Sequence, residues 1–254
     1  MMAKKKKVER LKLNEAVSRL DRMIDLVYLD VQVALGIEAA LETANETMMG
    51  DLRGVKFHGA DCYNAVSQSM SMFLTITLAK LFETPTLRGL SKATRYNRSD
   101  VASIPLMIRL LKQRRIQKNL CNRARDWTPS LQYTSDINAK SCGRAIDRSV
   151  EAYRMLRGKH TGRIAVAKLR KFRDKVAAHT LMVEALKASP TYNELFLLMD
   201  VARDVTEHAR LAISGIHVDL KDSEERLIEM SRAFWTPALH AAASKNGRFR
   251  RRAA

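Results

Sequence analysis

The sequence predicts an all-α protein, an up-and-down bundle of five to six helices. Apolar residues recur at steps of three or four along most of the chain, which is the period of an amphipathic helix. The 254 residues include only 10 Gly and 5 Pro, and 46% of them are hydrophobic. No segment has a credible strand pattern. Helices of this kind bury their apolar faces by packing side by side in a bundle.

The first half of the chain predicts two long helices. Residues 13–48 have an apolar face with charges between its members, and residues 50–59, bounded by glycines, break the pattern. A second helix is expected over residues 60–82. Because this segment is apolar on nearly all sides, we expect it to be the buried central helix.

Basic residues and a proline mark the middle of the chain. Residues 88–97 lack an apolar face and are expected to form a loop. A helix is then expected from a cap at Ser99 or Asp100 through about Asn122, with Pro105 tolerated only in or near its first turn. Residues 127–129, Trp-Thr-Pro, end this part of the pattern.

The second half predicts further helices with clear boundaries. The helical pattern of residues 136–187 is interrupted at 158–162, and residues 164–186 are expected to form one continuous helix. Thr191 to Glu194 is a capping box that starts the next helix, which Gly215 stops. The last helix is expected from Asp222 or Ser223 to about Ala243.

The positive charge is concentrated in three segments. The formal net charge is +18, of which residues 1–12 and 245–254 carry +5 each and residues 88–125 carry +10. We therefore expect a basic tail at 1–12, one helical domain at 13–243 with a basic helical insert at about 88–125, and a basic tail at 244–254. Such segments attract polyanions, nucleic acid above all, although basic tails are often only solvated. The candidate nucleic-acid-binding residues of the insert are Arg109, Lys112, Arg114, Arg115 and Lys118.

The cysteines and the hydropathy pattern favour a cytoplasmic protein. Cys62, Cys121 and Cys142 are far apart and lack metal-ligand spacing, so we expect neither disulfides nor a zinc site. The basic N-terminus is not followed by an apolar signal segment, and no run of 18 uncharged apolar residues occurs. We expect no membrane partner, no metal and no cofactor.

Residues 173–180, Arg-Asp-Lys-Val-Ala-Ala-His-Thr, are the most informative stretch. They resemble the R-x(4–6)-H signature of the HEPN superfamily of helical ribonucleases, and most of all its abortive-infection AbiU branch. Residues 71–83 look like that branch's hydrophobic helix, which ends in a LARLFD-type turn, with Lys80 and Glu83 here in place of the usual Arg and Asp. The resemblance covers roughly residues 15–215.

This resemblance implies a HEPN-like bundle and a metal-independent endoribonuclease of a toxin–antitoxin or phage-defence type, acting on RNA as a homodimer, with a possible antitoxin partner. His179 would transfer protons and Arg173 would stabilise the phosphorane. Asp174 would orient a ring or a sugar hydroxyl, and Lys175 would depress the pKa of the imidazole or contact phosphate. Six helical residues separate Arg173 from His179 by about 9 Å and about 240°, so a second signature helix across a two-fold axis is expected to complete the site.

Other interpretations remain open. Arg53/His58 and Arg154/His160 have the same spacing but span glycines, whereas Arg203/His208 and Arg210/His217 are reserve candidates. Arg173 and Asp174 are also compatible with ordinary surface charges. The alternative function is a non-catalytic HEPN-like module that binds RNA or a protein partner. A third is a basic helical DNA-binding structural protein, which no helix-turn-helix spacing supports.

Overall fold

The computed structural model describes residues 11–55, 59–84, 100–174 and 189–250, and all regular secondary structure in these ranges is helical. The prediction of an all-α fold is therefore confirmed, with more helices than the five or six expected. The helices are α1 (Leu13–Met49), α2 (Ala60–Leu81), α4 (Ile104–Leu111), α5 (Arg114–Ala124), α6 (Ser135–Gly158), α7 (His160–Phe172), α8 (Tyr192–Ser214) and α9 (Leu220–Arg250), with a short 3-10 helix at Gln132–Thr134. None of the described helices is both long and apolar enough to cross a membrane.

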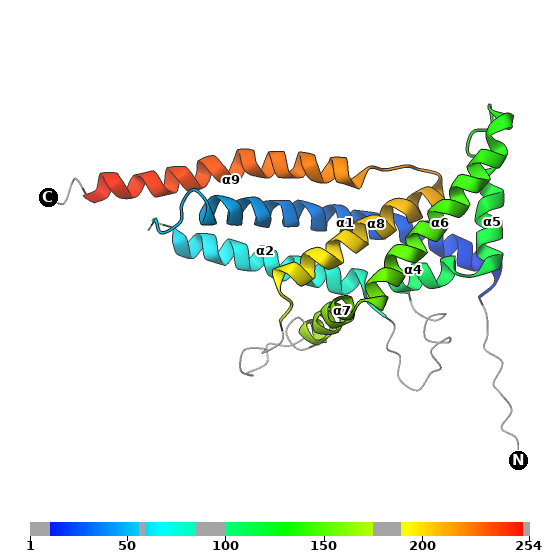
Figure 1. The fold of residues 1–254 in the computed structure, drawn as a ribbon, viewed down its shortest axis with the longest axis horizontal. Coiled ribbons are helices and arrows are strands. Elements are labelled where there is room, and N and C mark those ends of the chain that lie inside the picture. Colours follow the sequence, from blue (N-terminus) through cyan, green and yellow to red (C-terminus); the bar gives the residue numbers. More distant parts are fainter. Residues whose placement is uncertain (1–10, 56–58, 85–99, 175–188, 251–254) are drawn as a thin grey trace, which may run out of the picture.

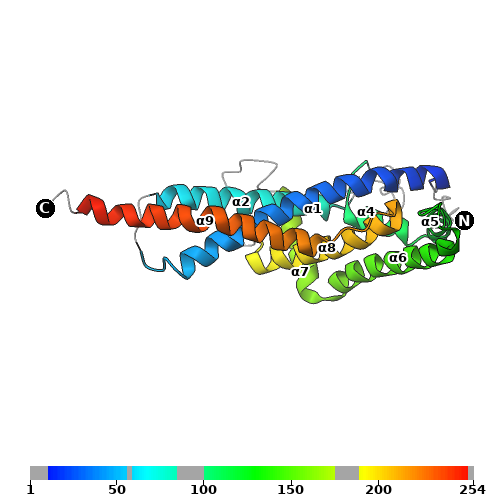
Figure 2. The ribbon, with the colours of Figure 1, turned by 90° about the horizontal axis from the view of Figure 1, so that it is seen from above.

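Helix α1 lies at the centre of the bundle. In Figure 1, α9, α1 and α2 run along the long axis one beneath another, and α8 crosses α1. Figure 2, seen from above, places α6 on the far side of α8 from α1. The face of α1 that meets these helices is fully buried at Leu20, Val27 and Val31. Its 37 residues thus form the axis around which the other helices pack.

The expectation that the second helix is the buried central one is wrong. Only the C-terminal half of α2 is buried, at residues such as Leu74, Leu78 and Leu81. Val66, Phe73 and Ile76 of the same helix are 38%, 53% and 39% exposed. A helix that is apolar on all sides in sequence is not necessarily surrounded by other helices. Helix α2 lies at the edge of the layer, with α1 on one side.

Residues of α2 and α9 come together at the C-terminal end of α1. The rings of Tyr63 and Trp235 stand edge to face with centroids 6.3 Å apart, and the hydroxyls of Thr47 and Thr236 lie 3.4 Å apart. Ala44 of α1 is fully buried there. Residues from the first, second and last long helices therefore close this end of the bundle together.

The single helix expected up to Asn122 is two helices. Ser103 is the N-cap residue of α4 and Pro105 lies in its first turn, so Asp100 is outside the helix. The chain turns at Lys112 and Gln113, where the side-chain Nε2 of Gln117 donates to the carbonyl of Leu111 at 2.8 Å and satisfies one orphan carbonyl at the end of α4. The sequence pattern did not reveal this turn because neither glycine nor proline marks it. Helix α4 is almost wholly buried, so the first helix of the basic segment belongs to the core. The expected loop at 88–97 lies outside the described residues.

The close approach of α6 and α7 depends on a glycine. A Cβ atom at Gly162 would lie 2.3 Å from the carbonyl oxygen of Leu156, which no side chain can tolerate. Helix α7 begins at His160, four residues before the expected start, and its helical conformation continues as a π turn through Asp174. The rest of the helix expected over 164–186 lies outside the described residues.

The boundaries predicted for α8 are confirmed. The Thr191 hydroxyl accepts from the amide of Glu194 at 3.3 Å, and the Glu194 carboxylate accepts from the amide of Thr191 at 2.8 Å. Gly215 ends α8 with a φ of 72°, a left-handed conformation that favours glycine. Helix α9 starts at Leu220 and runs to Arg250, so most of the basic segment expected as a tail after 243 continues the helix.

Candidate functional site

Two of the three expected catalytic residues lie at the end of α7. Arg173 and Asp174 form the π turn that follows Phe172, with Arg173 partly buried and Asp174 exposed. His179 and Lys175 lie outside the described residues. The approach of His179 to Arg173 is therefore still a prediction.

Arg173 is held between two carboxylates. Its Nη1 lies 2.9 Å from Oε1 of Glu83, and its Nε and Nη2 donate to Oδ1 of Asp174 at 2.9 and 2.7 Å. The side chains of Arg173 and Glu83 are 26% and 27% exposed, against 61% for Asp174. Glu83 follows α2 directly, so the two segments that carry the family resemblance, 71–83 and 173–180, meet at this ion pair.

Both residues of the ion pair follow buried residues of the helices that carry them. Phe82, next to Glu83, is 2% exposed, and its amide donates to the carbonyl of Leu78. On α7, Val166 and Leu169 are buried in the core. Because α2 and α7 also pack against each other, the guanidinium has a fixed position at the surface.

The carboxylates keep Arg173 charged and also offset its charge. Burial alone would lower the pKa of Arg173, but the hydrogen bond and charge of Asp174 and the charge of Glu83 outweigh burial and raise this pKa. The guanidinium is therefore a permanent cation. Among the described residues, these contacts engage Nε, Nη1 and Nη2 once each, and each terminal nitrogen carries a second N–H of the kind that donates to phosphates.

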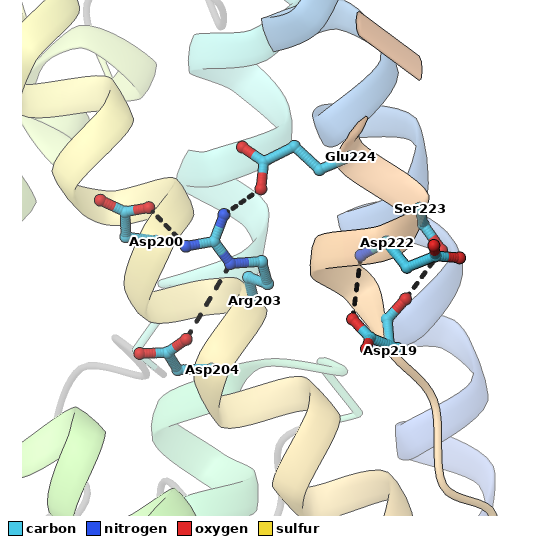
Figure 3. A network of polar contacts seen from close by, with 7 residues as sticks. All are labelled: Asp200, Arg203, Asp204, Asp219, Asp222, Ser223 and Glu224. Carbon is cyan, nitrogen blue, oxygen red and sulfur yellow. Dashed lines mark hydrogen bonds and ion pairs between the residues drawn. The ribbon is translucent and has the colours of Figure 1, made fainter. Parts of the chain in front are cut away.

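Arg203, the arginine of the first reserve pair, belongs to an interhelical network. Figure 3 shows its guanidinium between Asp200 and Asp204 of α8 and Glu224 of α9. The contact with Glu224 ties α8 to α9. Burial, followed by the charges of Glu224 and Asp200, raises the pKa of nearby Glu38 to about 8. Arg203 therefore has a structural role in joining α8 to α9.

The described residues of the other Arg–His pairs form no shared site. His208 is half-buried and its pKa is lowered chiefly by burial. The guanidinium of Arg210 packs 3.6 Å above the ring of Tyr28, whereas His217 lies in the connection between α8 and α9. Arg154 binds Glu151 one turn earlier on α6, with Nε and Nη2 donating at 2.6 and 2.7 Å. Arg53 lies in the turn after α1, and its partner in sequence, residue 58, is outside the described residues.

The five candidate nucleic-acid-binding residues of the 88–125 segment fall into two groups. Lys112, Arg114 and Lys118 are exposed, around the turn between α4 and α5 and along α5. Arg115 instead donates from Nη2 to the carbonyl of Leu11 at 2.7 Å, which ties α5 to the residues before α1. Arg109 is partly buried on α4. Only the exposed group is well placed for a polyanion.

A match to a family model identifies the class of protein, a HEPN-type helical protein. Within this class, the family model described as AbiU2 matches residues 57–234, which include Glu83, Arg173 and the N-terminal half of α9, and the chain belongs to this AbiU2 family. The search of curated proteins found no match. The search of solved structures also found none.

Glu83 is the site residue that the sequence did not single out. Its position at the end of the helix of residues 71–83 was recognised only as a departure from the usual Asp. Glu83 keeps the negative charge of the usual Asp at this helix end. That charge could have predicted the contact, because a partly buried arginine needs a counter-charge.

Proposed function

We propose that this protein is a metal-independent endoribonuclease of a phage-defence or toxin–antitoxin type. The observation that carries the proposal is the contact between Arg173 and Glu83, which fixes the signature arginine on two packed helices with N–H groups able to reach a phosphate. Membership of the AbiU2 family supports the abortive-infection setting.

The proposed chemistry is transesterification followed by release of the 5′ product. The 2′-oxygen of the ribose loses its proton to a base and attacks the adjacent phosphorus, the bond to the 5′-oxygen breaks, and an acid protonates that oxygen. A 2′,3′-cyclic phosphate and a 5′-hydroxyl result. His179 transfers protons, Arg173 stabilises the charge on the phosphorane, and Asp174 orients groups near the arginine.

A second copy of the chain completes this site. Arg173 and His179 on one continuous helix would point in different directions, by about 240° of rotation. Two signature helices related by a two-fold axis would bring the arginine of one protomer near the histidine of the other. We propose a homodimer for this reason, with inhibition by a cognate antitoxin as the natural means of control.

A second candidate function is a non-catalytic module that binds RNA or a protein partner. The observation in its favour is the local charge, since one arginine stands beside two carboxylates, Glu83 and Asp174, in the described part of the site. These carboxylates compete with phosphate for the guanidinium. In this case Lys112, Arg114 and Lys118 supply the affinity and His179 is dispensable.

A cleavage assay with matched variants separates the two functions. Purified wild-type protein should cleave single-stranded RNA in EDTA, because the proposed chemistry uses no metal. Arg173→Ala and His179→Ala should each lose at least about 100-fold in rate. Arg154→Ala and His160→Ala are the controls, since this pair also has an R-x5-H spacing and both side chains are exposed.

The results assign the function directly. Loss of cleavage only in the Arg173 and His179 variants establishes the ribonuclease. RNA binding without cleavage by any form establishes the non-catalytic module, and tight binding to duplex DNA in preference to RNA points to the DNA-binding structural protein.

A further inference from the structure

An open groove lies between α2, α7 and α8, beside the Arg173 site. Its volume is about 490 Å³, within the range of about 300–1,000 Å³ typical of sites for small organic groups. Phe172, the residue before Arg173, forms part of its wall. The groove and the phosphate site therefore share the end of α7.

The lining of the groove combines aromatic rings with hydrogen-bonding groups. Phe172 is partly buried and Tyr192, the first residue of α8, is 43% exposed. Gln68 and Ser71 of α2 and Thr191 at the start of α8 add an amide and hydroxyls. Rings that stack and short polar side chains that donate and accept are what proteins use for unstacked bases of single-stranded RNA.

Tyr192 is fixed across the groove. Its hydroxyl lies 2.9 Å from that of Ser71 on α2, and its ring packs against Phe196 with centroids 6.2 Å apart. The ring is therefore oriented before any ligand arrives, which reduces the entropy lost on binding. Gln68 is exposed one turn away on α2, with its amide available to the edge of a base.

The groove also lies at a suitable distance from Arg173. Thr75 lines the groove and Glu83, which contacts Arg173, follows eight residues later, about 12 Å along the direction of α2. A dinucleotide spans this distance. An RNA strand with a phosphate at Arg173 is able to place a neighbouring base in the groove.

We propose that this groove binds a base of single-stranded RNA close to the phosphate at Arg173, and so sets a base preference for the strand. This inference rests on the proposed ribonuclease function for the position of the strand, but the binding itself requires no cleavage. Phe172 and Tyr192 stack on the base, Gln68 contacts its edge, and Arg173 contacts the phosphate.

The test uses the full chain and probes that cannot react. Fluorescein-labelled 2′-O-methyl decamers of A, C and U lack the nucleophilic 2′-hydroxyl, so their dissociation constants report binding alone. The variants are Tyr192→Leu, which removes the ring, and Gln68→Ala, which removes the amide. Asn64→Ala is the control, because Asn64 is exposed one turn earlier on α2 and does not line the groove.

The expected result is a loss of affinity confined to the groove variants. Tyr192→Leu should weaken the preferred decamer between about 5- and 150-fold, the range for one stacked base. Gln68→Ala should reduce the difference between the decamers, and Asn64→Ala should change neither. Thermal unfolding of each variant checks that the fold is intact, and Gln68→Ala, at an exposed position, carries the test if Tyr192→Leu does not fold.

Photocrosslinking locates the bound strand independently. Decamers that contain 4-thiouridine should crosslink to Phe172 or Tyr192. Unchanged affinities in both groove variants, or crosslinks found only on α5, overturn the inference. Cleavage that depends on Arg173 but shows no effect of the groove variants leaves the ribonuclease standing without this base site. RNA binding that depends on the groove, without cleavage by any form of the protein, supports the base site and overturns the ribonuclease function.

Discussion

Nη1 of Arg173 lies 2.9 Å from Oε1 of Glu83, and this contact joins the end of α7 to the end of α2. The two residues are 90 positions apart in the sequence, and their side chains are exposed to almost the same extent. The signature arginine is therefore oriented by a second helix of its own protomer before any partner or substrate binds.

Removing the charge of Glu83 should lower RNA cleavage with little effect on folding. Glu83→Gln takes away the counter-charge that orients Arg173, so we expect the cleavage rate to fall by about 10-fold or more. The free energy of unfolding should fall by no more than about 1 kcal/mol, because the pair is partly exposed. Glu83→Asp should keep most of the activity. Equal rates for Glu83→Gln and wild type would show that this contact does not position the arginine.

Charge reversal on the exposed basic group should weaken RNA binding in a salt-dependent manner. The triple variant Lys112→Glu, Arg114→Glu, Lys118→Glu should flatten the plot of log affinity against log salt by up to three contacts, about 2 in slope for a single strand. Arg115 is left unchanged because it binds the carbonyl of Leu11. The control reverses Lys221, Arg226 and Arg232 of α9, which are also exposed. If the slope of log affinity against log salt is the same for the Lys112/Arg114/Lys118 variant as for wild type, this basic group is not the binding surface.

Glu38→Gln should stabilise the protein at alkaline pH. Burial first, and then Glu224 and Asp200, raise the pKa of Glu38 from 4.5 to about 8, so the folded state binds this proton more tightly than the unfolded state does. Stability is therefore lost as the pH rises from about 4.5 to about 8. Urea unfolding should show no difference between wild type and Glu38→Gln near pH 4.5, and a gain of up to about 4 kcal/mol for the variant at pH 9. A difference that is constant with pH would contradict this assignment.

Two glycines at the junction of α6 and α7 should respond in opposite ways to alanine. Gly162→Ala introduces a Cβ that would lie 2.3 Å from the Leu156 carbonyl oxygen, and we expect it to cost about 1–3 kcal/mol. Gly158→Ala meets nothing within 4 Å and should be neutral or stabilise by up to about 1 kcal/mol. Thermal or urea unfolding measures both. If the two variants are equally stable, the backbones of α6 and α7 do not approach closely at Gly162.

Local signals in the sequence predicted the helices well where a single residue type sets the boundary. Gly215 and the Thr191–Glu194 box placed both ends of α8, because a left-handed φ and a reciprocal cap are local properties. The turn at Lys112 and Gln113 escaped prediction because it depends on the burial of α4, which is decided by α1, α6 and α8. The exposure of the N-terminal half of α2 was not predicted either, because it also depends on which helices pack against α2.

The candidate site was predicted only in part. The resemblance led to Arg173 and Asp174 and to residues 71–83, but the pairing of Glu83 with Arg173 is a tertiary contact that no spacing encodes. Arg115 was expected to bind nucleic acid because a basic residue on an amphipathic helix is usually solvated. Its bond to the Leu11 carbonyl depends on where the chain before α1 runs, which the sequence pattern does not contain.

The packing of α9 along α1 has a consequence for the order in which the chain folds during synthesis. Leu35 and Ala44 of α1 leave the ribosome early, while partly buried Trp235 and buried Leu239 of α9 are among the last packed residues to be made. A nascent chain that ends before Leu220 must hold the α9-facing side of α1 open to solvent and to other chains. Native closure of this bundle therefore follows translation of its last helix, and until then α1 is the surface on which a chaperone would be expected to act.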